Sequence, residues 1–241
     1  MDECENIHKF GIHDYCTHSF GPAGIGCVFP INKSEMIAIT MKEVILFEND
    51  EIKSKARYNF SCACFIPEVS LIVGHTYRGS ELFAFQTNDF DHPILSHYQT
   101  DHVGVYHIIY SPKSHALITI GTGIKVWNIT WVELGMRMIS SNAKIIITSR
   151  ASYANHYDTP ILNQPVFDYE KERLYLPTAE GITGFDLDGV PCELITRLPA
   201  DVQTIFAYCP ENEKVMTSDS VNGVCVWKKG GKIEKRISTL G

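Results

Sequence analysis

One short phrase recurs along this chain: an alternating apolar segment that ends in a bulky aromatic residue followed by a polar one. It reads VILFEN, ELFAFQ, GIKVWNIT, ITGFDL and GVCVWK. The aromatic positions are separated by 38, 42, 58 and 42 residues, and they are Phe47, Phe85, Trp127, Phe185 and Trp227. Three of the four intervals lie near 40 residues, which is the length of a complete supersecondary unit. This period constrains the fold more than any other feature of the sequence.

Two further apolar runs precede each aromatic phrase. The first run ends at a residue that stops a ladder or favours a turn, as in CVFP, CFIP, IYSP, VFDY and AYCP. The second run is MIAIT, SLIVG, ALITI, RLYLP or KVMTS. A more polar segment follows, clearest in EIKSKARYN (51–59) and KIEKRISTL (232–240), and charges of this kind protect a sheet edge from pairing with other chains. Each unit therefore predicts a sheet of four antiparallel strands.

The inner runs are almost continuously apolar, as in VYHIIY and ALITI, which indicates sheets that are covered on both faces. No long segment shows the apolar spacing of an amphipathic helix. Radially stacked four-stranded sheets cover one another in this way. We therefore predict an all-β fold, a β-propeller of four-stranded antiparallel blades in a single domain spanning 1–241. The blade-like units are expected at about 21–58, 59–100, 101–150, 161–200 and 201–241, with an insertion within 131–160.

Some of these units resemble blades of the WD-repeat family. The segment 102–129, HVGVYHIIYSPKSHALITIGTGIKVWNI, has a histidine entering the first strand and Trp127-Asn128 where the family usually has Trp-Asp. The segments 206–228 and 167–189 are similar, the latter with Phe-Asp at this place. The resemblance implies a propeller that binds other proteins.

The family's blades also contain a buried hydrogen-bonded set of a histidine, a serine or threonine, an aspartate in the second turn, and the tryptophan. His102, Thr119 and Trp127 match three of these roles, whereas the turn GTG offers no aspartate. Buried polar groups need partners. The resemblance therefore implies an incomplete set, with His102 as a partly exposed loop residue.

The number of units leaves the closure of the ring open. Propellers have about four to eight blades, and WD-repeat propellers most often resemble seven. The chain is either a compact five-bladed ring, or a partial ring that another segment or chain completes, or a shortened gene product. The segment NIHKFGIHDYC (6–16) has a strand-like composition and is a candidate for an additional outer strand.

Charge and hydropathy exclude several classes of partner. The formal net charge of −7 argues against a phosphate-backbone binder, and the one basic cluster, KKGGKIEKR (228–236), predicts a solvated hairpin tip. The N-terminus lacks the pattern of a secretory signal, and no apolar run approaches the roughly 18 residues of a membrane span. We therefore expect a cytoplasmic protein with no nucleic-acid partner and no membrane insertion. Its eight cysteines are expected to be mostly reduced and buried.

Loops outside the repeat are the candidate contact sites. The interval of 58 residues has a surplus within 131–160, where AKIIITS predicts a strand and RASYANHYDTP a polar loop. Exposed aromatic residues supply much of the energy of an interface; the alternative is an insertion that packs against its own blade. The candidate partner-binding residues are His75, Tyr77 and Arg78 in a turn of the second unit, His102, and Tyr153, His156 and Tyr157 in the insertion.

No motif for catalysis, a metal or a cofactor is recognisable, since GPAGIG (21–26) lacks the lysine of a phosphate loop and the His and Cys spacings do not converge on a metal. We therefore expect no cofactor and a non-enzymatic scaffold that binds protein partners within a larger intracellular assembly, with cytoskeletal or ciliary association as one setting. One alternative is a glycoside hydrolase with carboxylates at a channel mouth, and another is a structural subunit with no independent fold. The carboxylates considered are Asp89, Asp91, Asp101, Asp158, Glu180 and Asp219.

Overall fold

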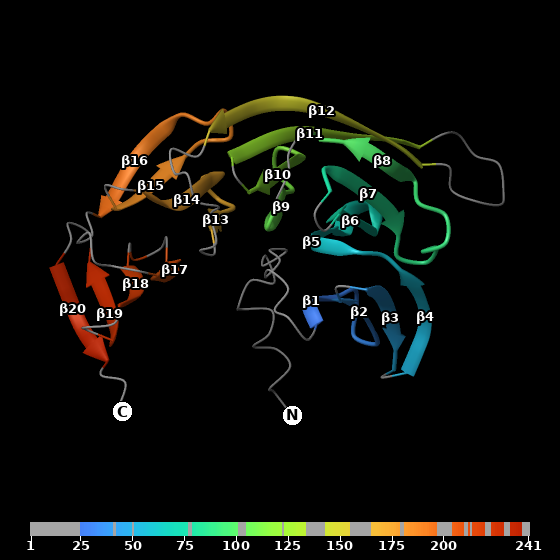
Figure 1. Cartoon of the computed structure of the whole chain (residues 1–241), viewed down its shortest axis with the longest axis horizontal. Helices are drawn as coiled ribbons and strands as arrows, with labels where there is room; N and C mark the ends of the chain where they lie inside the picture. Colours follow the sequence, from blue (N-terminus) through green and yellow to red (C-terminus); the bar gives the residue numbers. More distant parts are fainter. Residues whose placement is uncertain are drawn as a thin grey trace. The chain divides into compact units, whose positions relative to one another are not determined.

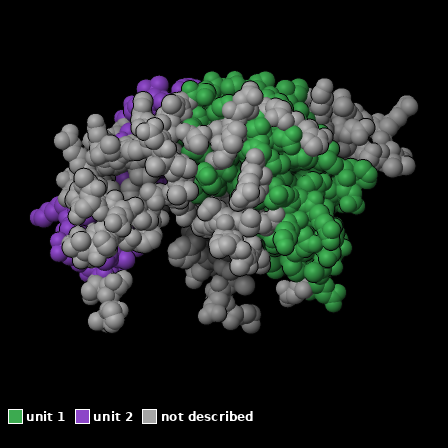
Figure 2. All heavy atoms as spheres, in the orientation of Figure 1, with its two compact units in different colours: residues 1–160 green, residues 161–241 purple. Residues whose placement is uncertain are grey.

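The computed structural model divides into two compact units, 1–160 and 161–241, which Figure 2 shows in green and purple. A single domain over the whole chain, 1–241, stays a prediction. The structure describes residues 25–40, 42–49, 51–76, 79–100, 105–121, 123–133, 143–154, 165–178, 181–196, 204–209, 212, 214–219, 223–228 and 232–237.

Five four-stranded sheets make up the described chain, and in each one every strand pairs antiparallel with the next (Figure 1). We call them blades 1 to 5 in chain order. Unit 1 contains blades 1 to 3. Blade 1 consists of β1 (Ile25–Pro30), β2 (Glu35–Thr40), β3 (Glu43–Glu48) and β4 (Glu51–Arg57). Blade 2 consists of β5 (Phe60–Ile66), the short 3-10 helix η1 (Pro67–Val69), β6 (Leu71–Thr76), β7 (Glu81–Gln86) and β8 (Leu95–Gln99). Blade 3 consists of β9 (His107–Ser111), β10 (Ala116–Ile120), β11 (Gly123–Glu133) and β12 (Ala143–Ala154).

Unit 2 contains blades 4 and 5. Blade 4 consists of β13 (Val166–Asp168), β14 (Arg173–Thr178), β15 (Gly181–Phe185) and β16 (Pro191–Thr196). Blade 5 consists of β17 (Thr204–Cys209), β18 (Lys214–Asp219), β19 (Gly223–Lys228) and β20 (Lys232–Ile237). The predicted all-β fold of four-stranded antiparallel blades is confirmed. Within the charged segments at 51–59 and 232–240, β4 (Glu51–Arg57) and β20 (Lys232–Ile237) are edge strands, as their composition predicted.

Each blade has two faces, because successive side chains of a strand point in opposite directions. We call the face that carries the recurring aromatic residue the aromatic face, and the other the opposite face. Phe60 and Phe85 on the aromatic face of blade 2 share a hydrophobic cluster with residues of the opposite face of blade 1, including Ile37 and Leu46. Trp127 of blade 3 packs in the same way with the opposite face of blade 2.

Blade 5 repeats this arrangement in unit 2. Its Trp227 and Val215 form one cluster with Tyr175 and Ile182 from the opposite face of blade 4. In three independent instances, then, an aromatic face is buried against the opposite face of the preceding blade. At roughly 25 cal/mol per Å² of buried apolar surface, this mutual burial is the main favourable contribution to the fold.

A buried hydroxyl accompanies the aromatic residue wherever that residue is tryptophan. Trp127 Nε1 donates a hydrogen bond to Thr119 Oγ1 at 3.0 Å, and Trp227 Nε1 donates to Thr217 Oγ1 at 2.7 Å. The two threonines occupy the same place in their blades, two residues along the second strand from the residue paired with the tryptophan. A buried indole N–H requires an acceptor. The Thr119–Trp127 pairing expected from the family resemblance is therefore present, and it recurs in blade 5.

The three blades with phenylalanine at this position have no hydroxyl at the corresponding place, where the residues are Ala38, Gly74 and Leu176. Phenylalanine has no donor to satisfy, so the polar partner is not needed. At Gly74 a Cβ would lie 2.8 Å from ring atoms of Phe60, so this glycine makes room for a ring of its own sheet. The second strand is thus adapted, blade by blade, to the aromatic residue beside it.

The insertion expected within 131–160 is different from the predicted loop. β11 and β12 are 11 and 12 residues long, and they pair from Gly123–Ala154 to Glu133–Ala143 as a long ribbon (Figure 1). The prediction that a loop begins at Arg150 was wrong, because residues 150–154 belong to the outer strand of the blade. An outer strand is polar for the same reason that a loop is polar, since one side of it faces water.

The far half of this ribbon packs against blade 2 rather than projecting freely. Ile129, Ile145 and Ile147 are buried in the cluster between blades 2 and 3. Tyr98 of β8 donates a hydrogen bond from its hydroxyl to the backbone oxygen of Ile147 at 3.1 Å. The described part of 131–160 therefore pairs within blade 3 and also packs against blade 2, which differs from an insertion packed against its own blade alone.

We predict that Thr119→Val destabilises the protein by about 1–3 kcal/mol, because the buried Trp127 N–H loses its acceptor. In a Trp127→Phe background the same change should cost clearly less, since the ring then has no donor. Urea unfolding of the two single variants and the double variant measures this coupling. Equal costs in both backgrounds would contradict the assigned role of Thr119.

Candidate functional site

The structure places His75 in the interior and not in a surface turn. It lies within β6 with none of its surface exposed, so the prediction that it contacts a partner was wrong. Its Nδ1 lies 3.1 Å from the Thr76 backbone oxygen and its Nε2 lies 3.4 Å from Thr100 Oγ1. Thr100 Oγ1 donates to the Ser80 oxygen at 2.7 Å. His75 therefore links β6 to Thr100, the residue that follows β8 in blade 2.

The same polar chain continues into blade 3. Lys125 of β11 donates a hydrogen bond from Nζ to the Thr100 backbone oxygen at 2.7 Å, and this Nζ lies 5.6 Å from the centre of the Trp127 ring. A lysine over an indole face is an attractive cation–π contact. Sequence reasoning missed Thr100 and Lys125, because no local pattern links residues 25 positions apart. This polar chain links blade 3 to blade 2.

The other predicted contact residues stay predictions. Tyr77, Arg78, His102, His156 and Tyr157 lie outside the described residues. The backbone of Tyr153 pairs with Ile124 in the outer strand of blade 3, while its side chain is outside the description.

The described acidic residues mostly organise turns. Asp89 accepts a hydrogen bond from His92 Nδ1 at 3.0 Å and one from the His92 backbone, and this histidine lowers the pKa of the Asp89 carboxyl. Asp168 and Asp186 accept from backbone N–H groups two to four residues further on, as aspartates in tight turns do. Asp101, Asp158 and Glu180 lie outside the described residues, as does the side chain of Asp219. Of the carboxylates considered for the hydrolase, Asp89 thus has a structural partner and Asp91 is exposed, and neither provides an argument for that function.

Within the described ranges, no group of three or more His, Cys, Asp and Glu side chains could hold a metal ion. No helix among the described residues is long and apolar enough to cross a membrane. Among the described cysteines, Cys62, Cys64 and Cys225 are buried thiols outside any disulfide, as expected. Cys192 is an exposed thiol that donates a hydrogen bond to the Gly184 oxygen at 3.2 Å.

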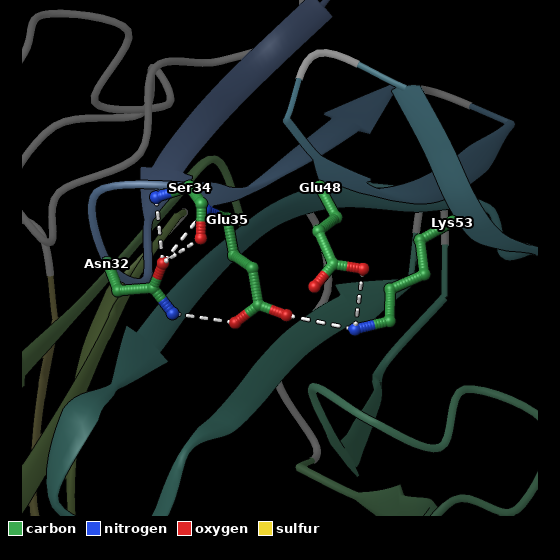
Figure 3. Close-up of polar contacts among 5 residues, drawn as sticks. All are labelled: Asn32, Ser34, Glu35, Glu48 and Lys53. Atoms are coloured by element: carbon green, nitrogen blue, oxygen red, sulfur yellow. Dashed lines mark hydrogen bonds and ion pairs between the residues drawn. The ribbon is translucent and has the colours of Figure 1, made fainter.

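Charged side chains meet at one corner of blade 1 (Figure 3). It lies where the β1–β2 and β3–β4 connections meet. Lys53 Nζ lies 3.0 Å from Glu35 Oε1 and 3.1 Å from Glu48 Oε2, so one ammonium group bridges two carboxylates. Asn32 Nδ2 donates to the other oxygen of Glu35 at 2.6 Å, while its Oδ1 accepts from the N–H groups of Ser34 and Glu35. The turn therefore holds Glu35 in place for Lys53.

Electrostatics follow from this geometry. The hydrogen bond from Lys53, followed by that from Asn32, lowers the pKa of Glu35 below its ordinary value. The hydrogen bonds to Glu35 and then to Glu48 raise the pKa of Lys53. All three side chains are accessible to water, so salt screens the attraction and its effect on stability is small. The corner is better suited to present charge than to hold the fold together.

Blade 5 carries the same corner with every charge reversed. Glu234 Oε2 lies 2.9 Å from Lys214 Nζ, and Glu234 Oε1 lies 3.7 Å from Lys228 Nζ. Lys53 and Glu234 are both the extra residue of a β-bulge opposite the aromatic position of the third strand. Their partners begin the second strand and end the third strand in each blade. The positions are structurally equivalent, and only the signs differ.

A fourth residue makes each corner unbalanced. Glu51 lies directly opposite Glu48 on the edge strand of blade 1, and Lys232 lies directly opposite Lys228 in blade 5. Like charges in such pairs destabilise a sheet, so neither pair is explained by stability. The blade 1 corner has three carboxylates and one lysine, and the blade 5 corner has three lysines and one glutamate. We call them the acidic corner and the basic corner.

These blades define the class of protein as a β-propeller at the level of fold. The structure is similar to the one titled "Crystal structure of WD40 beta propeller domain of Doa1", with a TM-score of 0.52, over 92% of this chain and 72% of that chain. The sequence identity is 10%, so the similarity shows the fold alone. No protein-family model matches the chain, and no curated protein matches it.

We predict that Lys53→Met raises the pKa of Glu35 toward its ordinary value, because it removes the largest cause of the lowered pKa. Because the pKa of Glu35 is lower in the folded state than in the unfolded state, its carboxylate stabilises the fold at pH values above the unfolded-state pKa. This contribution is lost as the pH falls through the folded-state pKa. Carboxyl NMR titration reads each residue directly. The control is Glu234, which should not respond to Lys53→Met and should respond to Lys214→Met. An unchanged Glu35 titration would refute the bridging role of Lys53.

Proposed function

We propose that this protein is a non-enzymatic interaction module that binds other proteins through its blade corners and connecting loops, as part of a larger assembly in the cytoplasm. The single observation that carries the proposal is the pair of charged corners, acidic on blade 1 and basic on blade 5. The WD40-type propeller fold supports it, because such stacked blades leave turns and loops as the accessible parts.

Charged corners of this kind favour recognition over catalysis. Complementary charges on a partner raise the association rate and suppress wrong partners, even where each exposed ion pair adds little affinity. Glu51 and Lys232 are exposed beside their bridged neighbours, so each corner has charge that its own ion pairs do not neutralise. Partners of the acidic corner should be basic, and partners of the basic corner should be acidic.

Tyr77, Arg78, His102, Tyr153, His156 and Tyr157 remain part of this proposal as candidate contacts in the loops. Aromatic side chains would supply affinity where the corners supply selectivity. Cytoskeletal or ciliary assemblies are one setting for such a module.

We predict that Lys228→Glu/Lys232→Glu removes one set of captured proteins, and that Glu48→Lys/Glu51→Lys removes a different set. Each double change reverses the sign of one corner and leaves the other intact. Affinity capture from the source cells, with quantitative mass spectrometry and proximity labelling, measures both sets.

The control is Lys42→Glu, a single lysine-to-glutamate change of the kind made twice in Lys228→Glu/Lys232→Glu, at an exposed site in the β2–β3 turn, away from the corner. Its captured set should equal that of the unmodified protein. If the corner variants capture the same proteins as the control, the corners are not binding sites.

A further inference from the structure

The edge strand of blade 5 carries cations that its own carboxylates do not neutralise. Lys232, Lys235 and Arg236 of β20 are all exposed, in a chain whose net charge is −7. Among the described residues none of these three forms an ion pair, because Glu234 is shared by the other two lysines of the basic corner. Cations without an ion pair stay in water, since removing them from it is costly. This edge of blade 5 is therefore charged and accessible.

The equivalent edge of blade 1 differs in this respect. β4 also carries three cations, Lys53, Lys55 and Arg57. Lys53 bridges two carboxylates, and Lys55 Nζ lies 3.9 Å from Glu43 Oε1. An edge strand can thus be protected from foreign strands by charges that are paired within its own blade. The unpaired cations of β20 are more than this protection requires.

The backbone of β20 has one open side. β20 is the last strand of its sheet and pairs with β19 alone (Figure 1). For the described residues, no backbone hydrogen bond joins β20 to any other segment. A strand in this position presents a row of N–H and C=O groups with which another extended segment can pair. With six residues, the open side is about 20 Å long.

The basic corner already shows which anion fits its lysines. The carboxylate of Glu234 lies between two of them, with Oε2 2.9 Å from Lys214 Nζ and Oε1 3.7 Å from Lys228 Nζ. Carboxylates of a partner would meet the remaining cations of the strand in the same way. Charged hydrogen bonds of this type are stronger than those between neutral groups.

The remaining cations are arranged as an added strand would read them. Lys235 lies opposite Val226 and Arg236 lies opposite Cys225, so these two side chains belong to different faces of the blade. A strand beside β20 also alternates its side chains between the two faces. Opposite charges directly across a strand pair are stabilising. Acidic side chains on both faces of the added segment therefore match β20.

We propose that β20 binds an extended acidic segment of a partner protein, which joins blade 5 as a fifth strand. The backbone of the segment pairs with the open side of β20, and its Asp or Glu side chains meet Lys232, Lys235 and Arg236. The proposal rests on the proposed function, because it names the partner chemistry of the basic corner. The cations that exclude an apolar or basic strand admit an acidic one.

A nucleic acid suits this edge less well. Three unpaired cations match few phosphates, whereas strong binding to a phosphate backbone uses about 6–10 such contacts. The net charge of −7 repels a long polyanion. A nucleic acid also lacks the peptide groups that would pair with the open side of β20.

The test is fluorescence anisotropy of the full chain with a labelled peptide of about ten alternating glutamate and valine residues, enough to cover the six residues of β20. We expect saturable binding with a Kd on the order of 100 µM or tighter, measured at protein concentrations up to about 300 µM. Binding should weaken as salt rises from about 50 to 300 mM, because salt screens exposed charges. Lys235→Glu/Arg236→Glu should raise the Kd about tenfold or more.

The matched control is Lys55→Glu/Arg57→Glu, which makes the same two substitutions on the edge strand of blade 1 and should leave the Kd unchanged. Circular dichroism verifies that both double variants are folded, and Lys235→Gln/Arg236→Gln replaces the first if it is not. Amide hydrogen exchange by NMR tests the pairing itself. The N–H groups of β20 that do not bond to β19 should exchange more slowly when the peptide is bound, which a purely electrostatic contact would not produce.

Four results overturn the proposal. They are an absence of saturable binding, an equal loss in the two double variants, binding without slower exchange in β20, and tighter binding of a single-stranded DNA of similar length than of the peptide. In each case the capture experiment decides the proposed function separately. If Lys228→Glu/Lys232→Glu still removes captured proteins, the basic corner binds partners and only the added strand is wrong.

Discussion

Face-to-face burial of neighbouring sheets is the constraint on which the rest of this structure depends. A four-stranded sheet with apolar residues on both faces is not stable in water by itself, so each blade needs a neighbour on either side. Phe85, Trp127 and Trp227 meet this need by inserting into the preceding blade. The same requirement explains why the interior of every blade is apolar and why polar functions are confined to corners and edges.

Several polar groups in the interior have partners that the packing of the blades supplies. Thr119 and Thr217 accept from the indole N–H groups beside them, and the blades with phenylalanine have no hydroxyl at that place. His75, Thr100 and Lys125 form a longer polar chain from blade 2 to blade 3. Buried polar groups that are satisfied in this way specify one arrangement of the sheets more strictly than apolar packing does.

The exposed charges have a different logic. Lys53 and Glu234 occupy the same bulge in blades 1 and 5, and each bridges two residues of opposite charge. The repeated backbone thus provides the same corner geometry in both blades, and the side chains placed there have opposite charges in the two cases. Because such exposed pairs contribute little to stability, the sign is free to vary, and it is the property that a binding partner would read.

The sequence by itself determined the number of blades, the order of their strands and the charged edge strands, because spacing, alternation and composition are local properties that directly reflect a strand's two faces. It also indicated the Thr119–Trp127 pair. Only the tertiary structure decided that His75 is buried, that residues 150–154 are strand, and that Lys125 reaches Thr100. The tertiary structure also assembled each charged corner from residues that lie up to 20 positions apart in the sequence. Contacts between strands and between blades depend on register and on bulges, and a bulge leaves no clear signal in the order of residues.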